Sequence, residues 1–228
     1  MQPYFMPYIG YFQLIAAVDL FILYDNIKYT KKGWFNRNRM LRNEKDVIFS
    51  LSLKNGSDQL NVGDRELAAD FSRDRLLNQF SGAYRRAPYF IQTFPLIEQI
   101  VRYEDANLFR FLRHSIFKVC EHLGIATEMR ISSEVVIDHD LKSQDKVLAL
   151  CAAVGATTYV NPIGGVELYS SEVFREKGVD LRFLRSKPFE YVQFDNVFVP
   201  WLSIIDVMMF NSVKDIQGQL LSVDLIRV

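Results

Sequence analysis

The last hundred residues alternate between short apolar strands and helices, and this alternation constrains the fold more than any other feature of the sequence. The strand-like segments are Thr127–Ile131, Thr157–Val160 and Leu181–Leu184. The helical segments are Lys142–Val154, Ser170–Lys177 and Pro200–Asn211. Strands and helices in this order pack as a parallel sheet covered by helices. We therefore expect an α/β fold with a Rossmann-like parallel sheet flanked by helices.

The first fifty residues add a helix, a strand and a hairpin. Tyr11–Val18 has the pattern of a short helix, and the apolar run Leu20–Tyr24 is typical of a buried parallel strand. Two extended runs, 34–41 and 47–53, flank the polar segment 42–46. A polar segment between two extended runs predicts a peripheral β-hairpin.

Helical periodicity takes over from about residue 71 to 124. Gly124 is placed to end the last helix of this segment. The expected core faces consist of Leu76, Leu77, Phe80 and Tyr84, then Ile91, Phe94, Ile97 and Val101, then Phe109, Leu112, Ile116, Val119 and Leu123. No linker or internal repeat is visible, so we expect one domain over residues 1–228 with a helical insertion at about 71–124.

Charge and hydropathy exclude several classes of partner. The net charge is zero and the pI is near 6.8, which argues against a nucleic-acid partner. No stretch approaches 18 uncharged apolar residues, so we expect no membrane insertion. The N-terminal residues lack the features of a signal peptide. These observations predict a cytoplasmic protein.

No nucleophile or metal site stands out. Cys120 and Cys151 lie in apolar helical patterns, which favours buried thiols over a catalytic thiolate or a metal ligand. His114 and His122 are eight residues apart on one helix, roughly 12 Å along its axis, so one metal ion cannot bridge them. His139 lies in an Asp-His-Asp sequence, which is either a metal patch or a polar loop.

Ligands of open α/β sheets bind beyond the carboxyl ends of the strands. Three segments occupy such positions, namely Asp25-Asn26, Ser132-Ser133 and Asn161-Pro-Ile-Gly-Gly165. In the third, Gly164 and Gly165 would let backbone N–H groups approach a phosphate or carboxylate, unless they form only a tight turn. Glu167 and Tyr169 follow and would add an acid and a phenol. This arrangement predicts a binding crevice at these strand ends.

A local basic cluster precedes the hairpin in this otherwise neutral chain. It consists of Lys31, Lys32, Arg37 and Arg39 around Trp34. Arg37 and Arg39 are at strand spacing, so both guanidinium groups would point to one face and suit a diphosphate or two carboxylates. The alternative is an edge strand whose charges protect it from pairing with another chain.

Several long sequence strings together resemble the WbqC-like protein family. The strings are Gln2-Pro-Tyr-Phe-Met-Pro-Tyr-Ile-Gly-Tyr-Phe-Gln13, Asp19, Tyr24-Asp25, Lys32-Gly-Trp34, Asn36-Arg37-Asn-Arg39, Tyr159-Val-Asn161-Pro-Ile-Gly-Gly165, Glu167-Leu-Tyr169 and Leu202-Ser-Ile-Ile-Asp206. The resemblance implies a role in surface-polysaccharide (O-antigen type) biosynthesis, as a transferase or ligase that attaches an amino acid such as glycine to an amino sugar. One departure is that members of the family usually carry a short apolar strand before the Gln-Pro sequence.

The N-terminal region is also similar to the first strand-turn-helix of adenylate-forming nucleotidylyltransferases. In that family a His-x-Gly-His turn holds the phosphates of ATP. The aligned turn here is Tyr8-Ile-Gly10-Tyr11, in which the glycine is kept and tyrosines replace both histidines. Tyrosine donates a hydrogen bond but carries no positive charge near neutral pH. Lys31, Lys32 or Arg37 would have to supply that charge.

The resemblances and the strand-end segments together give the expected site. Substrate-binding residues would be Gln2, Tyr8, Gly10, Tyr11, Gln13, Asn26, Lys32, Trp34, Asn36, Arg37, Arg39, Asn161, Gly164, Gly165 and Tyr169. Asp25 or Glu167 would accept a proton as the catalytic group. The substrate would be a nucleotide-activated amino sugar or an amino acid, with ATP and Mg²⁺ as candidate cofactors and no metal bound by the protein itself. The alternative is a non-catalytic protein that binds a nucleotide-sugar or glycan in the same pathway.

Overall fold

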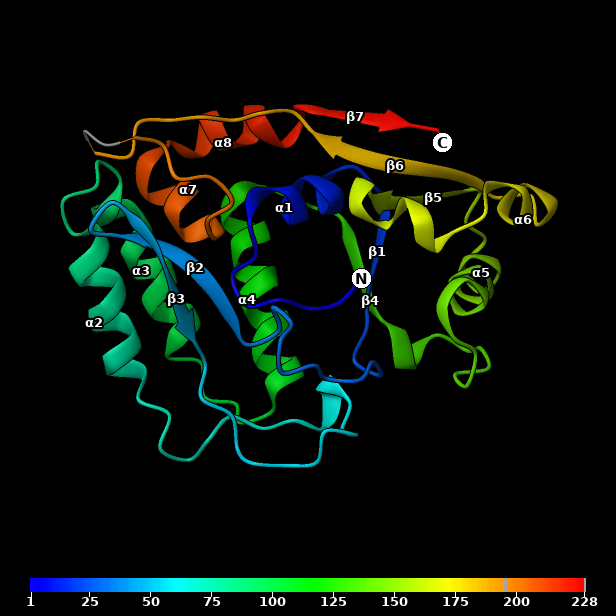
Figure 1. Ribbon diagram of the computed structural model, residues 1–228, viewed down its shortest axis with the longest axis horizontal. Helices are drawn as coiled ribbons and strands as arrows, with labels where there is room; N and C mark the ends of the chain where they lie inside the picture. The colour runs from blue at the N-terminus through cyan, green and yellow to red at the C-terminus, as the bar shows by residue number, and fades with distance from the viewer. Residues whose placement is uncertain (195–196, 228) are drawn as a thin grey trace.

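The structure, a computed structural model that describes residues 1–194 and 197–227, contains two pairs of parallel strands, one near the middle and one at the upper right of the view (Figure 1). β1 (Leu20–Leu23) pairs in parallel with β4 (Glu128–Ile131). β5 (Thr158–Pro162) pairs in parallel with β6 (Asp180–Ser186), and β7 (Val223–Ile226) adds an antiparallel edge to β6. The mixed α/β class is confirmed.

The predicted Rossmann-like sheet is present only in part. The described strands form separate small sheets, β1–β4, β2–β3 and β5–β6–β7, because no hydrogen bonds join β1 to β5 across the described residues. Side chains from both strands line a groove that lies between them. In Figure 1, β1 runs down the view while β5 and β6 run across it, so the two parallel pairs are strongly twisted relative to each other.

The hairpin is formed by β2 (Arg37–Arg42) and β3 (Lys45–Ser50), which pair antiparallel. Its turn is shorter than expected and consists of Asn43 and Glu44, with φ of 50° and 65°. Two consecutive residues with positive φ give the turn the twist that a two-residue hairpin needs. The hairpin lies beside the helical segment (Figure 1).

Three helices occupy the segment with helical periodicity, namely α2 (Arg73–Tyr84), α3 (Phe90–Val101) and α4 (Leu108–Leu123). Gly124 ends α4 in the left-handed conformation, with φ of 70°. The expected face of α3 is wrong at Ile91, which is 82% exposed. Thr93 lies in the core instead, because its hydroxyl donates to the Met208 carbonyl and so needs no water. A satisfied polar residue in a core position is not visible in an apolar pattern.

The remaining α-helices of the described residues are short. They are α1 (Ile9–Ala16), α5 (Ser143–Val154), α6 (Ser171–Glu176), α7 (Ile204–Phe210) and α8 (Val213–Leu220). The apolar pattern does not predict α8, although Ser212 caps this helix by accepting from the N–H of Asp215, which is a sequence signal for a helix start. Among the described residues, no helix has the length and apolar character needed to cross a membrane.

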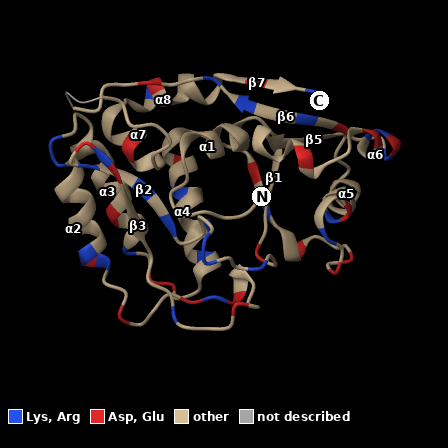
Figure 2. Cartoon of the chain, in the orientation of Figure 1, with Lys and Arg blue, Asp and Glu red and all other residues tan. Residues whose placement is uncertain are grey.

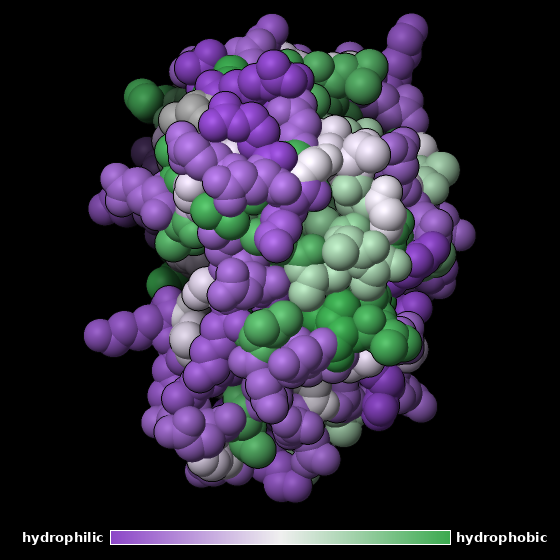
Figure 3. All heavy atoms as spheres, turned by 90° about the vertical axis from the view of Figure 1, so that its right-hand side faces the viewer, coloured by the Kyte–Doolittle hydropathy of each residue, from purple (hydrophilic) through white to green (hydrophobic). Residues whose placement is uncertain are grey.

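The surface carries both signs of charge without a dominant field. Lysines and arginines are interspersed with aspartates and glutamates along the chain (Figure 2), and the net charge is zero. The face on which α5 and α6 lie is largely hydrophilic, with one apolar band across its middle (Figure 3). Such a surface offers no basis for long-range steering of a polyanion.

Candidate active site

Polar side chains from the carboxyl ends of β1 and β4 bond to one another. The Asp25 carboxylate accepts from the backbone N–H of Ser133 at 3.0 Å and from its hydroxyl at 2.5 Å. The Ser132 hydroxyl donates to Asn26 Oδ1 at 2.8 Å. Because β1 and β4 are parallel neighbours, their ends meet at one edge, and two of the three predicted segments are therefore in direct contact.

His139 joins this cluster through Asn26. Asn26 Nδ2 lies 2.9 Å from His139 Nδ1, and the bond from Ser132 fixes which end of the amide is the donor. The amide therefore donates to Nδ1, which leaves the proton of the neutral imidazole on Nε2. His139 is thus held in one tautomer by residues from the strand ends.

Lys146 brings a positive charge to the same place from α5. Its Nζ donates to the His139 carbonyl at 3.4 Å and lies 5.7 Å from the centre of the Tyr24 ring. Burial lowers the pKa of the Lys146 ammonium, while the nearby Asp25 and Asp140 carboxylates act in the opposite direction. A half-buried ammonium next to polar side chains is suited to binding a phosphate or carboxylate.

The third predicted segment begins at the carboxyl end of β5. The Tyr159 hydroxyl lies 3.3 Å from both Asn161 Oδ1 and the Tyr169 hydroxyl. Tyr24, Tyr159 and Asn161 line the same groove between β1 and β5, so this segment lies near the end of β1. Burial raises the pKa of Tyr24. We call Asp25, Asn26, Ser132, Ser133, His139, Lys146, Tyr24, Tyr159, Asn161 and Tyr169 the strand-end cluster.

The two glycines after β5 have different surroundings. They lie in a 3₁₀ helix (Ile163–Leu168), so they do not form an open loop. A Cβ on Gly165 would lie 2.0 Å from Asn161 Nδ2, whereas a Cβ on Gly164 would meet nothing within 4 Å. Gly165 therefore leaves the space into which the Asn161 amide packs.

Gly165→Ala is expected to displace the Asn161 side chain and to lower the free energy of unfolding by about 1–2 kcal/mol, a typical effect of overpacking. Gly164→Ala is the matched control, expected to change stability by less than about 0.5 kcal/mol. Urea unfolding of both variants gives the comparison. Equal losses for the two variants would contradict this packing.

Arg37 and Arg39 point to one face of β2, as their spacing predicted. Each guanidinium carbon lies 5.7 Å from the centre of the Trp34 ring. Arg37 donates to the carbonyls of Gly33 and Lys32, and Arg39 donates to Asp46 and to the Trp201 carbonyl. We call Trp34, Arg37, Arg39 and Trp201 the arginine–tryptophan patch.

The turn before α1 does not form an open phosphate cradle. A Cβ on Gly10 would lie 2.4 Å from the Tyr8 ring, so this ring covers the start of the helix. Tyr8 also meets Trp201 edge to face at 5.9 Å. Tyr11 is buried, and its hydroxyl donates to the Gln2 carbonyl. Tyr8 thus connects α1 to the arginine–tryptophan patch, while Tyr11 has a packing role.

Several predicted residues lie outside the strand-end cluster. Gln13 is buried and donates to the Gln219 carbonyl, which ties α1 to α8. Asn36 accepts from Tyr29 and donates to the Leu51 carbonyl. Lys32 and Glu167 are exposed. Gln13 and Asn36 therefore support the fold around the site, and the Gln2 amide oxygen accepts from Tyr4.

The structure adds Tyr24, His139, Lys146 and Tyr159 to the residues expected near the strand ends. Ser132 and Ser133 were expected there, because they directly follow β4. His139 carried no such signal, because its partner Asn26 lies 113 residues away in the sequence.

Thiol and metal chemistry find little support in the described part of the chain. Burial raises the pKa of Cys120 to about 12 and that of Cys151 to about 11, so both side chains are thiols at neutral pH. This confirms the expectation of buried thiols. Residues 1–194 and 197–227 contain no group of three or more His, Cys, Asp or Glu side chains that could hold a metal ion.

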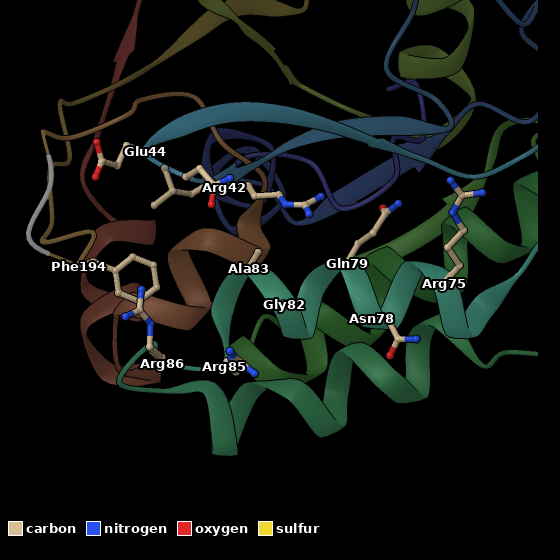
Figure 4. Close-up of a pocket in the computed structure, with 12 residues that line it drawn as sticks. Arg42, Glu44, Arg75, Asn78, Gln79, Gly82, Ala83, Arg85, Arg86 and Phe194 are labelled. Atoms are coloured by element: carbon tan, nitrogen blue, oxygen red, sulfur yellow. The ribbon is translucent and has the colours of Figure 1, made fainter.

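A second cavity, of about 890 Å³, lies away from the predicted site. It is bordered by the turn of the hairpin and the exposed side of α2 (Figure 4). Four arginines line it, namely Arg42, Arg75, Arg85 and Arg86. Arg86 packs over the ring of Phe194, with 5.6 Å from the guanidinium carbon to the ring centre. This groove is the main competing location for an anionic ligand.

The comparisons with known proteins agree with the resemblance noted in the sequence. The model of the WbqC-like protein family matches residues 2–218. The uncharacterized protein Rv1507c of Mycobacterium tuberculosis is 27% identical over 217 residues, which cover 92% of this chain and 91% of that protein. No solved structure matches the chain significantly. Since the family model covers nearly the whole sequence, the chain belongs to the WbqC-like protein family.

Proposed function

We propose that this protein is a cytoplasmic transferase or ligase of surface-polysaccharide biosynthesis that attaches an amino acid such as glycine to a nucleotide-activated amino sugar. Family membership supports the pathway. We place the reaction at the carboxyl ends of the parallel strands because Asp25, His139 and Lys146 lie close together there. Acid–base groups beside a half-buried cation suit a reaction in which a proton moves and an anion departs.

The most concrete version of the reaction is ATP-dependent amide formation. The carboxylate of the amino acid attacks the α-phosphorus of ATP, and pyrophosphate leaves to give an acyl-adenylate. The amine of the sugar then attacks the acyl carbon, AMP leaves, and the amine gives up one proton. The protein would position the reactants and neutralise phosphate charge.

The described contacts suggest a role for each group. Lys146 would bind the phosphate or the carboxylate, since its ammonium is half-buried beside His139 and Tyr24. Asp25 would accept the amine proton, because Ser133 holds its carboxylate in place. His139 would act as a second proton carrier through Nε2. Arg37 and Arg39 would hold the nucleotide, whose base would stack on Trp34.

A pyrophosphate-release screen tests this proposal. The protein is incubated with ATP, Mg²⁺, single amino acids and UDP- or dTDP-amino sugars. We expect at most about one equivalent of pyrophosphate per protein with an amino acid alone, and continued release only when an amino sugar is also present. No release across the panel, with no shift of the melting temperature by any nucleotide, would overturn it. Turnover without ATP would indicate a preactivated acyl donor instead.

Lys146→Met is expected to lower kcat/KM, or the affinity for the nucleotide sugar, by about 10–100-fold, the range for a lost charged hydrogen bond. Lys142→Met is the matched control. Lys142 is the residue that precedes α5, close to Lys146 in the sequence, but it is exposed. Steady-state kinetics or calorimetric titration gives both values. Equal effects of the two substitutions would remove Lys146 from the site.

A binding protein without catalysis is the second candidate. The arginine–tryptophan patch favours it, since two guanidinium groups and an indole ring can hold a sugar nucleotide without any reacting group. This candidate predicts nucleotide-sugar binding without turnover, and loss of that binding in Arg37→Ala.

A further inference from the structure

The arginine-lined groove between α2 and the hairpin holds an excess of positive charge. Arg42, Arg75, Arg85 and Arg86 line it, together with one carboxylate, that of Glu44 (Figure 4). The lining therefore carries three more positive than negative charges, although the chain as a whole is neutral. A hollow lined by charge of one sign attracts ligands of the opposite charge locally, even in a molecule of zero net charge.

The four guanidinium groups of this groove have no carboxylate partner in the part of the chain that the structure describes. Within residues 1–194 and 197–227, none of them forms an ion pair or donates a side-chain hydrogen bond. By contrast, Arg102 beside α3 and Arg110 on α4 each pair with a carboxylate at 3.0 Å or less. Guanidinium groups that share one groove and have no partner there are available to bind anionic groups of a ligand.

The charges are spread along the groove. Arg75, Gln79, Gly82 and Arg85 follow one another at three- or four-residue spacing, so they share one face of α2. At 1.5 Å per residue, Arg75 and Arg85 are roughly 15 Å apart along the helix axis. Arg42 approaches from the hairpin, on the side opposite α2 (Figure 4). A ligand that meets all of these groups must itself be extended and carry more than one negative charge.

Amide side chains and a glycine occupy the middle of the groove. The amides of Asn78 and Gln79 make no hydrogen bond to any described residue. Each amide offers both a donor and an acceptor, which is what a hydroxyl group needs from its partner. A Cβ on Gly82 would meet nothing within 4 Å, so the packing of the described residues does not require glycine there. Because glycine within a helix costs about 0.5–1 kcal/mol relative to alanine, its effect here is to leave the groove floor open to a ligand.

The groove offers little apolar surface for a ligand to pack against. Phe194 is the aromatic residue of its described lining, and the Arg86 guanidinium lies over this ring, 5.6 Å from its centre. The Phe194 ring also meets Phe210 edge to face at 4.8 Å. A single-stranded nucleic acid, which stacks its bases on open aromatic rings, would find no such platform here. An extended ligand with hydroxyl groups between its negative charges matches the lining better.

We propose that the arginine-lined groove binds an acidic oligosaccharide, that is, a linear chain of sugars that carries carboxylate or phosphate groups. Its negative groups pair with the arginines at the two ends of the groove, and its hydroxyl groups bond Asn78 and Gln79. The anionic character of the ligand follows from the groove alone, whereas the choice of a glycan also rests on the proposed role in polysaccharide biosynthesis. The groove is separate from the strand-end cluster, so it adds a second binding site to the protein.

Calorimetric titration of the full chain with hexagalacturonate, a linear chain of six uronic acids, tests this binding. Maltohexaose, a neutral chain of the same length, is the matched ligand. In about 50 mM NaCl we expect hexagalacturonate to bind at least about tenfold more tightly than maltohexaose. We also expect its affinity to fall when the salt is raised to about 200 mM, because salt screens exposed charges. Equal affinities for the two sugars, or an affinity that salt leaves unchanged, would overturn the proposal.

Two changes to the groove locate the bound sugar. Arg42→Gln combined with Arg85→Gln is expected to weaken binding of hexagalacturonate about tenfold, since two exposed charge-assisted contacts are lost. Gly82→Leu is expected to weaken it at least about tenfold by filling the middle of the groove, while the melting temperature stays the same or rises because leucine favours a helix.

Each change has a matched control elsewhere on the surface. Arg113 on α4 is exposed and has no side-chain partner among the described residues, so Arg113→Gln removes an equivalent charge. Gly218 on α8 is exposed, and a Cβ there would also meet nothing within 4 Å, so Gly218→Leu adds an equivalent side chain. Both controls are expected to change the affinity less than about twofold.

Equal effects of the groove and control substitutions would place the sugar elsewhere and contradict the proposal, as would no binding of hexagalacturonate at millimolar concentration. Hexaglutamate separates a glycan from an acidic peptide. Binding of hexaglutamate as tight as that of hexagalacturonate, with the same loss in Gly82→Leu, would identify a peptide site and overturn the choice of a glycan. These titrations contain neither ATP nor an amino sugar, so their outcome is independent of the pyrophosphate-release screen.

Discussion

Asp206→Ala is expected to lower the free energy of unfolding by about 3–5 kcal/mol, because it leaves three buried donors without an acceptor. The Asp206 side chain is fully buried. It accepts from the hydroxyls of Tyr84 and Tyr191 and from the amide of Gln193, at 2.9, 2.6 and 2.7 Å. Burial raises the pKa of Asp206 to about 6, while these three bonds oppose that rise.

The same network supports the candidate site. Asp206 lies on α7, and the residues that start this helix bond the N-terminal loop. Ser203 donates from its hydroxyl to the Met6 carbonyl, and the Ile204 N–H donates to the Pro7 carbonyl. Loss of Asp206 is therefore expected to loosen the loop that presents Tyr8 as well as the core.

Urea unfolding at pH 7.5 measures this effect. Asp206→Asn retains the shape and one acceptor, so a smaller loss than for alanine is expected. The exposed Asp70 gives a matched control, with an expected change of less than about 0.5 kcal/mol for Asp70→Ala. A loss below about 1 kcal/mol for Asp206→Ala would show that water or rearranged side chains replace the carboxylate.

The 228-residue chain with a free amino group is expected to gain stability as the pH rises from about 5 to 8. The Met1 amino group has a folded pKa of about 5 and an unfolded pKa of 8.0. Between these values the unfolded chain binds more protons, so a higher pH favours the folded state. Three pH units at about 1.36 kcal/mol each set an upper limit of about 4 kcal/mol.

Acetylation of the amino group provides the control, because it removes the charge and keeps the N–H that bonds Ile22. The titratable side chains lining the groove around this group are Asp19, Tyr24, Cys151 and Tyr159. These side chains and Asp206 are present in both the free and the acetylated chain. Their contributions therefore cancel when the free energies of unfolding of the two chains are subtracted. The acetylated chain is expected to be the more stable at pH 5, with the gap closing by pH 8. Parallel pH profiles would show that the ammonium is hydrated in the folded state.

The sequence predicted most helices and strands because their signals are local. The apolar run of β1 and the glycines that end α4 and α5 were sufficient to place these elements. Pairing between strands is not local, so the separation of β1 from β5 was not predictable from either strand. Ile91 was misplaced for a related reason, since the core position of Thr93 depends on a carbonyl in α7.

The residues of the candidate site were also only partly predictable from the sequence. Asp25 and Asn26 could be selected because they come just after β1, and Asn161 because it lies at the carboxyl end of β5. Parallel strands bring such positions to one edge. Lys146 and His139 come from outside the strands, and only the packing of α5 and its preceding loop brings them to Asn26. Gln13 is also part of the family's sequence motif, but its side chain bonds α1 to α8 and does not reach the strand-end cluster.

We expect the strand-end cluster to hold the ligand. A crystal structure of the protein with a UDP-amino sugar and a non-hydrolysable ATP analogue would show whether it does. Density for the ligand is expected within hydrogen-bond distance of Lys146 and Asp25, at the carboxyl ends of β1 and β5. Ligand density confined to the arginine-lined groove between α2 and the hairpin, with an empty strand-end cluster, would contradict it.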